Sequence, residues 1–237
     1  MSMVQPSALN SQTAVLVLAD FAAASRFWGW LRIVKGPSAL QAVDGLRFAK
    51  VLGSGYEGGF GLRPSGSRQG LFAVFHTAQA AQDFVERSQV LAAYRERCRE
   101  LCVVELLCWS CRGSWDGTSL DIVSHPPQDQ EPIAALTRAS IHVRKASAFW
   151  QHATPSQNAL GDVPGLQLAV GLGEAPFLRQ ATFTIWDSVA AMDAYARTGA
   201  HLQAIQSAGQ QQYFSESMFA RFILRRIQGQ WKNKQYG

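Results

Sequence analysis

Four cysteines, Cys98, Cys102, Cys108 and Cys111, lie within fourteen residues, a density that suggests a zinc site. The segment from Val103 to Cys111 is rich in apolar and β-forming residues, which predicts a strand. Residues three apart on a strand point to opposite faces, so Cys108 and Cys111 are not expected to share one metal ion. We therefore expect small buried or half-buried side chains, with a structural disulfide or a redox pair as the alternative.

A single histidine, His201, stands on the apolar face of an expected helix that follows a kink at Gly199. Apolar and polar residues separate onto two sides of this helix at steps of three and four: Ala204, Ile205 and Ala208 against Gln203, Gln206, Ser207 and Gln210. Such a histidine is either a core residue bonded to a backbone carbonyl or the axial ligand of a haem iron. The second role needs a neutral imidazole on a rigid helix inside an apolar cavity.

Other cofactor motifs are missing from the sequence. The remaining histidines form neither HxxxH nor HxxE pairs, no GxGxxG joins a strand to a helix, and there is no P-loop or GxSxG. The glycine-rich stretch over residues 53–61 joins two expected strands, so we interpret it as a hairpin loop. If His201 is not a metal ligand, Cys102 and His142 are the next candidates.

Five further residues could line a cofactor cavity. Lys50, Arg144 and Arg179 could each pair with a haem propionate, or could serve as a snorkelling or capping side chain. Phe183 and Trp186 are three apart on an expected strand and so point to opposite faces. Only one of these two aromatic residues is expected to line a cavity, and simple core packing is the alternative for both.

The chain repeats itself, and the repeat determines which elements must position these residues. Four short matches recur in the same order, 110 to 122 positions apart: Phe27-Trp28 with Phe149-Trp150, Gly45–Gly53 with Gly165–Gly173, Phe72–Thr77 with Thr182–Asp187, and Arg112–Trp115 with Gln228–Trp231. The offset places Leu91 opposite His201. One copy therefore has a leucine where the other has a histidine, which indicates that one half has specialised.

Each copy has the same expected order of elements. Strands are predicted at these paired positions: Ala14–Ala19 and Ala139–Val143, Leu46–Leu52 and Leu166–Leu172, Leu71–Phe75 and Ala181–Trp186, Val103–Trp109 and Ala220–Arg226. Helical segments follow the first and third strand of each set, with Thr77 or Asp187 as N-cap of the longer one. This βαββαβ order predicts an α+β fold in which two tandem ferredoxin-like repeats form a pseudo-dimeric α/β barrel. We assign residues 1–115 to the first repeat, 116–132 to a linker, and 133–237 to the second repeat, which carries the candidate haem site.

Composition favours a core-forming cytoplasmic protein. The 237 residues are 47% hydrophobic and only 16% charged, with a net charge of +5 that is scattered rather than gathered, which argues against a nucleic-acid partner. The first fourteen residues lack Lys and Arg, and the apolar stretch over residues 15–24 is short and contains Asp20. A peripheral contact with the inner membrane through the basic tail at Lys232 and Lys234 is an alternative to simple solvation of that tail.

The second copy resembles the spheroidene monooxygenase family. The resemblance is carried by these segments: Ala135–Ile141, Phe149-Trp150, Gly171–Trp186, Met192, Ala196-Arg197, Ala200-His201 and Tyr213–Phe222. The first copy follows the family more loosely, through residues 45–53 and 112–115. Two positions depart from the family pattern, because Arg179 stands where a histidine is expected and Tyr213 where a tryptophan is expected.

The resemblance implies an oxidoreductase that inserts oxygen into an acyclic carotenoid or a similar apolar substrate, converting a methylene to a ketone. It further implies haem as the iron cofactor, His201 as its axial ligand, molecular oxygen as co-substrate and an electron donor such as a ferredoxin or a reductase. Two alternatives remain open: a non-enzymatic protein that binds haem or a hydrophobic ligand, and a haem lyase or dehydratase on the same barrel. The sequence leaves the oligomeric state open.

Overall fold

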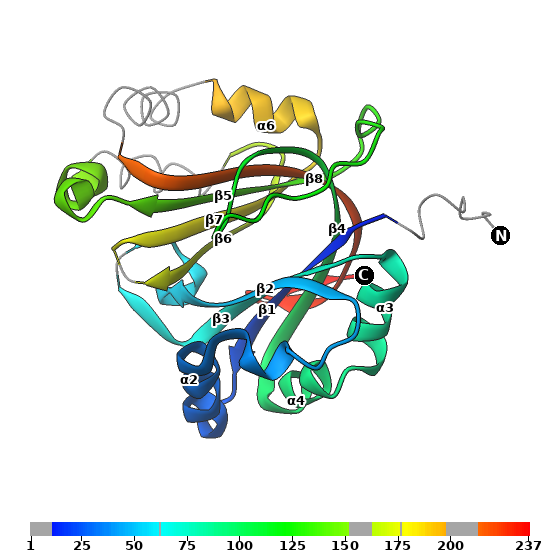
Figure 1. The fold of residues 1–237 in the computed structure, drawn as a ribbon, viewed down its shortest axis with the longest axis vertical. Helices are drawn as coiled ribbons and strands as arrows, with labels where there is room; N and C mark the ends of the chain where they lie inside the picture. Colours follow the sequence, from blue (N-terminus) through cyan, green and yellow to red (C-terminus); the bar gives the residue numbers. More distant parts are fainter. Residues whose placement is uncertain (1–10, 62, 152–162, 176, 198–212) are drawn as a thin grey trace.

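Eight strands close into one antiparallel barrel in the part of the chain that the computed structural model describes, residues 11–61, 63–151, 163–175, 177–197 and 213–237 (Figure 1). Neighbouring strands follow the order β4-β1-β3-β2-β6-β7-β5-β8, and β8 pairs back with β4, so the ring closes. A further strand, β9 (Lys234–Tyr236), forms a hairpin with β8.

The same βαββαβ order occurs twice. The first copy comprises β1 (Thr13–Phe21), α2 (Arg26–Lys35), β2 (Leu46–Gly55), β3 (Pro64–Phe75), α3 (Ala78–Arg87), α4 (Gln89–Arg97) and β4 (Cys98–Gly113), with short 3₁₀ turns η1 (Ala23–Ser25), η2 (Gly36–Leu40) and η3 (Tyr56–Gly58). The second comprises β5 (Ile133–Ile141), η4 (Val143–Lys145) leading into a helical turn over 146–151, β6 (Leu166–Ala175), β7 (Arg179–Trp186), α6 (Val189–Ala196) and β8 (Phe214–Trp231). Each copy arranges its strands in the ferredoxin-like order, fourth, first, third, second. The predicted fold of two ferredoxin-like repeats in one barrel is confirmed.

The first copy is buried on both faces of its sheet. All nine residues of β1 are buried, because alternate side chains point into the barrel and toward the covering helices. Leu16 and Leu18 belong to the barrel interior, whereas Val15 and Val17 belong to a second core under the helices. Burying one such aliphatic side chain contributes about 1.5–3 kcal/mol, which explains why Ala14–Ala19 is a continuous apolar run within this strand.

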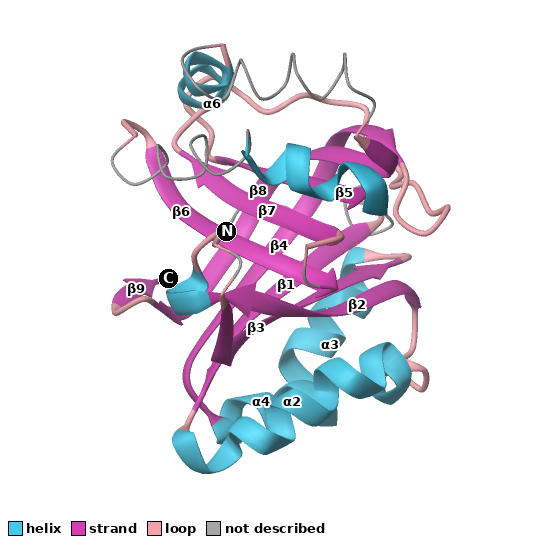
Figure 2. Ribbon diagram, turned by 90° about the vertical axis from the view of Figure 1, so that its left-hand side faces the viewer, coloured by secondary structure: helices cyan, strands magenta, loops and turns pink. Residues whose placement is uncertain are grey.

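Helices α2, α3 and α4 cover the outer face of the first sheet, on the side of the barrel opposite α6 (Figures 1 and 2). The hydroxyl of Thr77 accepts a hydrogen bond from the N–H of Ala80 at 3.1 Å, as the N-cap of α3, which confirms that prediction. Ser88 caps α4 in the same way, accepting from the N–H groups of Val90 and Leu91.

Two predicted boundaries of the second copy are wrong. Its first strand is β5, which runs from Ile133 to Ile141, rather than from Ala139 to Val143. Arg138 interrupts the apolar pattern in the middle of this strand, and its burial depends on partners distant in sequence. The N-cap of α6 is Ser188, which accepts from the N–H of Ala191 at 3.2 Å, so Asp187 stands one residue too early.

The segment predicted as a linker, residues 116–132, packs against the barrel over part of its length. Leu120 is buried in the interior core, and the N–H of Val123 donates to the carbonyl of Cys108 at 2.8 Å. The division of the chain into repeats at this segment remains a prediction.

A β-bulge overturns the prediction that Cys108 and Cys111 face opposite sides. Cys108 pairs with Phe222 and Ser110 with Arg221, so Trp109 has no partner residue in β8. The extra residue shifts the alternation by one, and both thiols face the barrel interior. Burial raises the pKa of the Cys98 and Cys102 thiols to about 12. A hydrogen bond with Cys108, by contrast, lowers the pKa of the Cys111 thiol below its ordinary value.

Candidate active site

The outer faces of the two sheets differ at positions that the strand registers make equivalent. These pairs, first copy first, are Val15 and Ala135, Val17 and Thr137, Leu71 and Thr182, Ala73 and Thr184, and Val51 and Gly171. Val17 is completely buried under the helices, whereas Thr137 is exposed. The second sheet therefore presents small or hydroxylated side chains where the first presents a packed aliphatic core. We call Ala135, Thr137, Thr182, Thr184 and Gly171 the floor.

The floor lies between two separate apolar clusters that both include residues of β5. At the start of the strand, Ile133 packs with Trp186 and Met192, and the ring of Trp186 lies 5.4 Å from that of Tyr195. At its end, Ile141 packs with Trp150. In the first copy one continuous core covers the same span. The separation of these two clusters leaves the intervening surface of the sheet free of large apolar side chains within the described residues.

One edge of the floor is covered by a loop from the first copy. A Cβ added to Gly171 would lie 2.4 Å from the carbonyl oxygen of Gly59 and 2.9 Å from the Cα of Phe60. Only glycine allows this loop to lie directly on β6. The Phe60 side chain then packs against the cluster around Trp186. Both copies thus contribute to the surroundings of the floor.

A hollow of about 470 Å³ borders the far end of β5. Among the described residues it is lined by His142, Val143, Arg144 and Lys145, which belong to η4 and the residue before it. Two cationic side chains and an imidazole thus surround one opening. This arrangement suits a ligand that carries carboxylates at one edge.

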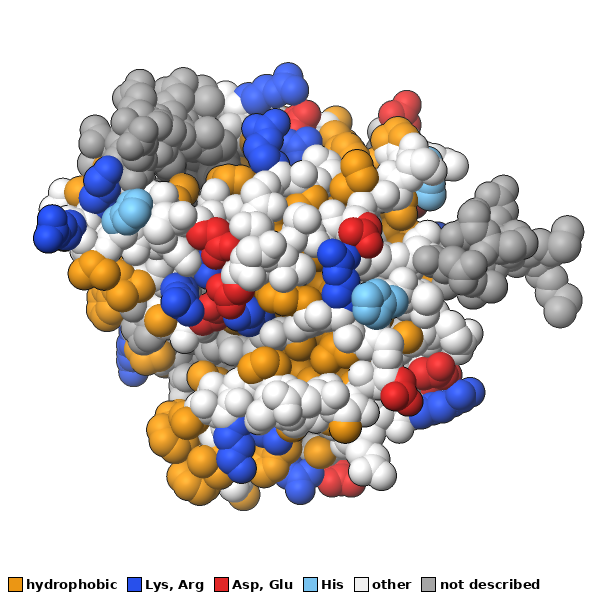
Figure 3. Space-filling model, in the orientation of Figure 1, with side chains coloured by type: hydrophobic (Ala, Val, Ile, Leu, Met, Phe, Trp, Pro, Cys, Tyr) orange, Lys and Arg blue, Asp and Glu red, His pale blue; other side chains and the backbone are white. Residues whose placement is uncertain are grey.

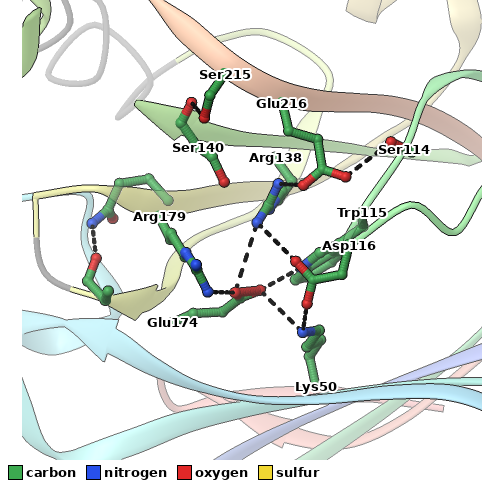
Figure 4. Close-up of polar contacts among 12 residues, drawn as sticks. Lys50, Ser114, Trp115, Asp116, Arg138, Ser140, Glu174, Arg179, Ser215 and Glu216 are labelled. Atoms are coloured by element: carbon green, nitrogen blue, oxygen red, sulfur yellow. Dashed lines mark hydrogen bonds and ion pairs between the residues drawn. The ribbon is translucent and has the colours of Figure 1, made fainter. Parts of the chain in front are cut away.

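Six charged residues form a cluster at the same end of the barrel, which we call the end cluster (Figure 4). Its members are Lys50, Asp116, Arg138, Glu174, Arg179 and Glu216. Arg138 Nη1 lies 2.5 Å from Glu216 Oε2, and its guanidinium lies 5.5 Å from the centre of the Trp115 ring. The cations and carboxylates are equal in number. The end cluster therefore neutralises itself and holds this end of the barrel together.

Glu216 is the best-satisfied carboxylate of the end cluster. Burial alone would raise the pKa of Glu216, but hydrogen bonds from Gly117, Ser114, Asp116 and Arg138 outweigh it and lower the pKa to about 2. The N–H of Gly117 and the hydroxyl of Ser114 each donate to Oε1 at 2.9 Å. Glu216 is thus ionised at neutral pH and joins β8 of the second copy to the turn that follows β4 of the first.

At the opposite end of the barrel, a glutamate of the first copy holds the turn that follows β8 of the second copy. Glu100 of β4 accepts from the N–H groups of Lys232 and Asn233, at 2.9 and 2.8 Å, in the turn after β8. Trp115 and Trp231, which stand at matching positions in the repeat, are both buried. Each copy therefore holds the terminal turn of the other.

The structure separates the predicted site residues. Lys50 forms an ion pair with Asp116 and lies 3.9 Å from Glu174, and Arg179 lies 3.5 Å from Glu174, so both are in the end cluster. Arg144 lines the hollow. His201 and Gly199 lie outside the described residues.

The two aromatic residues face opposite sides, as predicted. Phe183 is fully buried inside the barrel, whereas Trp186 packs on the outer face beside the floor. Sequence reasoning missed Arg138 and the floor threonines. Aligning the two copies strand by strand could have found them, because Arg138 stands at the position of Leu18.

Two further observations concern the described residues alone. They contain no helix long and apolar enough to cross a bilayer. They also contain no group of three or more His, Cys, Asp or Glu side chains arranged to hold a metal ion.

Comparison with known proteins establishes the family. The chain is 56% identical over 223 residues to a spheroidene monooxygenase of Rubrivivax gelatinosus, covering 94% of this chain and 86% of the relative. The chain belongs to the spheroidene monooxygenase family. A spheroidene monooxygenase of Rhodobacter capsulatus is 36% identical over 80% of each chain. The protein is therefore an enzyme, an oxidoreductase of the monooxygenase type. No family model matches the chain.

Solved structures support the fold independently of the family. Two structures of aldoxime dehydratase, one of them in complex with butyraldoxime, match with a TM-score of 0.59 each at 10% and 9% identity. The matches cover 94% and 91% of this chain and 84% and 80% of those chains. At this level of identity the similarity concerns the barrel fold alone.

Proposed function

We propose that this enzyme is a haem-dependent monooxygenase that converts a methylene of an acyclic carotenoid, or of a similar apolar substrate, to a ketone. Membership of the spheroidene monooxygenase family supports the reaction type and the substrate class. Two successive oxygen insertions at the methylene would give a geminal diol, which loses water to leave the ketone. Each insertion consumes one molecule of oxygen, two electrons and two protons and releases one water, so the reaction also requires molecular oxygen and an electron donor such as a ferredoxin or a reductase. When bound, haem supplies the activated-oxygen chemistry that side chains lack.

The observation that carries the cofactor proposal is the floor. A flat macrocycle needs a surface without protruding side chains, and the second sheet offers one around Thr137 and Thr182, where the first sheet is filled by Val17 and Leu71. The residues present therefore fit such a group. Arg144 and Lys145, which line the hollow, would pair with the carboxylates at the edge of the macrocycle.

The protein's own residues would bind and orient the cofactor and exclude water from it. The clusters around Trp186 and Trp150 would flank the macrocycle and keep the site apolar. His201 is the proposed axial ligand, with a second ring nitrogen that needs a hydrogen-bond acceptor. Lys50 and Arg179 remain propionate candidates, but their present carboxylate partners make Arg144 the stronger one.

Filling the floor tests the cofactor site directly. The double variant Thr137→Val, Thr182→Leu restores first-copy-like side chains, and Thr118→Val, in the turn after β4, is a control for a threonine-to-valine change elsewhere. We expect the wild type and the control to develop a Soret band on titration with haem, and the filled variant to bind haem at least about tenfold more weakly. Equal affinity of the filled variant would overturn placement of haem on the floor.

Replacing His201 tests the axial ligand. His201→Ala should lower haem occupancy or change the spin state of the iron while leaving the free energy of unfolding nearly unchanged. A core histidine would instead cost about 1–3 kcal/mol of stability and leave the haem spectrum unaltered. His142→Ala is the informative companion, because His142 lines the hollow whereas Cys102 is buried within the barrel. A Soret band that is unchanged in His201→Ala and lost in His142→Ala would reassign the ligand.

Activity requires its own measurement. Product formation from an acyclic carotenoid should depend on oxygen and on added reductant, and the product should carry a ketone in place of a methylene. Formation of the ketone without haem in the protein would refute the haem-dependent mechanism.

A further inference from the structure

Helix α2 carries an exposed apolar stripe. Phe27, Trp30 and Val34 are 70%, 55% and 62% exposed, and their spacing of three and four places them on one face of the helix. The rings of Phe27 and Trp30 stack at 6.0 Å from each other. In Figure 3 an apolar patch stands out at the lower left, over the position of α2 in Figure 1, with Lys and Arg side chains beside it.

The stripe is distinct from the surface by which α2 is attached to the barrel. On the attached side, the ring of Trp28 lies 5.7 Å from that of Phe21 and 5.3 Å from that of Tyr94. Gly29 is buried so closely that a Cβ there would lie 2.6 Å from the Phe21 ring. The helix is thus firmly packed, and its exposed residues form a second face that has no partner among the described residues.

The charges around the stripe are all positive within the helix. Residues 26–35 contain no Asp or Glu, and the exposed Arg26 and Lys35 stand at the two ends of α2. The helix dipole favours a cation such as Lys35 in the last turn of α2, but it disfavours a cation such as Arg26 in the first turn. An anionic surface in contact with the stripe would account for both.

The second copy lacks this feature at the matching motif. Phe149, which corresponds to Phe27, is half-buried and contacts the rings of Trp150, Tyr213 and Phe214. The same phenylalanine is therefore packed in one copy and exposed in the other. Exposed apolar residues are also found on η4 and on the β6–β7 turn, Val143 at 74% and Phe177 at 48%, and both segments lie on the left side of Figure 1, as α2 does.

We infer that α2 docks the enzyme onto an anionic lipid bilayer, inserting Phe27, Trp30 and Val34 while Arg26 and Lys35 contact the head groups. A protruding aromatic stripe with cations at both ends and no acidic residue is the composition of an interfacial helix. The inference extends the proposed function, since an apolar substrate dissolved in a bilayer must be taken up at its surface. It differs from docking through Lys232 and Lys234, because Lys234 donates to the carbonyl of Gln167 at 3.4 Å within a folded hairpin.

Vesicle sedimentation tests this surface without any need for activity or haem. The full chain is mixed with phosphatidylcholine vesicles, or with vesicles that also contain phosphatidylglycerol, at low and high salt. The apolar variant is Phe27→Ser, Trp30→Ser, Val34→Ser, and the charge variant is Arg26→Glu, Lys35→Glu. Ile122→Ser is the matched control, because Ile122 is 61% exposed and lies in the segment between β4 and β5.

We expect the wild type and Ile122→Ser to bind the anionic vesicles, and both α2 variants to bind at least about tenfold more weakly. Circular dichroism checks that each variant is folded. If the apolar variant does not fold, the charge variant alone tests the surface. Absence of wild-type binding, or binding unaffected by the α2 variants and abolished by Lys232→Ser, Lys234→Ser, would overturn the inference. If the α2 variants instead impair only reduction by a protein electron donor, the stripe is a protein-binding surface and the membrane assignment is wrong. Haem titration of the same variants shows separately whether the proposed cofactor site is intact.

Discussion

Glu216→Gln should destabilise the barrel because it leaves Arg138 buried beside a neutral partner. The Arg138 side chain is 2% exposed, and its closest carboxylate is Glu216 at 2.5 Å. A pKa of about 2 for Glu216, against an ordinary value of 4.5, corresponds to at most about 3 kcal/mol at neutral pH, and solvent screening reduces this because the Glu216 side chain is 24% exposed. Removing one partner of a buried ion pair costs about 3–5 kcal/mol, and the loss here is smaller because Asp116 and Glu174 remain 3.7 Å from Arg138. We expect a loss of about 2–3 kcal/mol in urea unfolding at pH 7.

The pH dependence of this loss follows from the direction of the pKa change. Because folding lowers the pKa of Glu216, its stabilisation is complete above the ordinary value and disappears as the pH falls toward about 2. The difference in unfolding free energy between the wild type and Glu216→Gln should therefore shrink between pH 4.5 and about 2. A difference that stays constant across this range would refute the assignment of the effect to ionised Glu216.

Two further variants separate the ion pair from the backbone hydrogen bonds. Glu100→Gln weakens the matching connection at the other end, where Leu18 replaces the arginine, so we expect a smaller loss of about 1–2 kcal/mol. Adding Arg138→Leu to Glu216→Gln removes the buried charge that has lost its closest carboxylate and should recover part of the stability. Equal losses for Glu100→Gln and Glu216→Gln, or no recovery in the double variant, would contradict the reasoning.

Two other predictions concern local geometry. The Cys111 thiol should be alkylated by iodoacetamide at a lower pH than an ordinary thiol, because Cys108 lowers its pKa, and Cys108→Ala should move the midpoint of alkylation to higher pH. An unchanged midpoint would exclude the thiol pair as the cause. Gly113→Ala should cost about 2 kcal/mol more in thermal or urea unfolding than Gly117→Ala. Both glycines have positive φ, but a Cβ at Gly113 would lie 2.0 Å from the Ser217 carbonyl oxygen, whereas at Gly117 it meets nothing within 4 Å; similar costs would show that backbone strain dominates.

The repeat made most of the fold predictable from the sequence. Matches such as Gly45–Gly53 with Gly165–Gly173 fall on strands β2 and β6, which lie at equivalent places in the two sheets. Local patterns failed where a distant partner decides the structure. Arg138 obscured the strand β5, because its burial depends on Glu216 from the far end of the chain. The bulge at Trp109 depends on pairing with β8 and has no local signal.

The site was only partly predictable for a related reason. His201 opposite Leu91 indicated that the second copy has specialised, and the floor shows specialisation of the same copy in its sheet. The floor is defined by side-chain groups that the first copy has and the second copy lacks. At the position of Thr137, for example, the first copy has the isopropyl group of Val17. Absences of this kind become visible when the strands of the two copies are aligned with each other, and the register of both sheets fixes that alignment.

The pairing of β4 with β8 has a consequence for the order of events during synthesis. Cys98–Gly113 is a sixteen-residue strand whose partner on one side, β8, is synthesised only after β5, β6 and β7. Until β8 arrives, the nascent first copy has an open strand edge, the feature through which chains associate wrongly. Because each copy holds the terminal turn of the other, closure of the ring is a late step that joins distant parts of the chain and slows folding. Two separately expressed halves should therefore require each other, and the open edges make either half alone prone to aggregation.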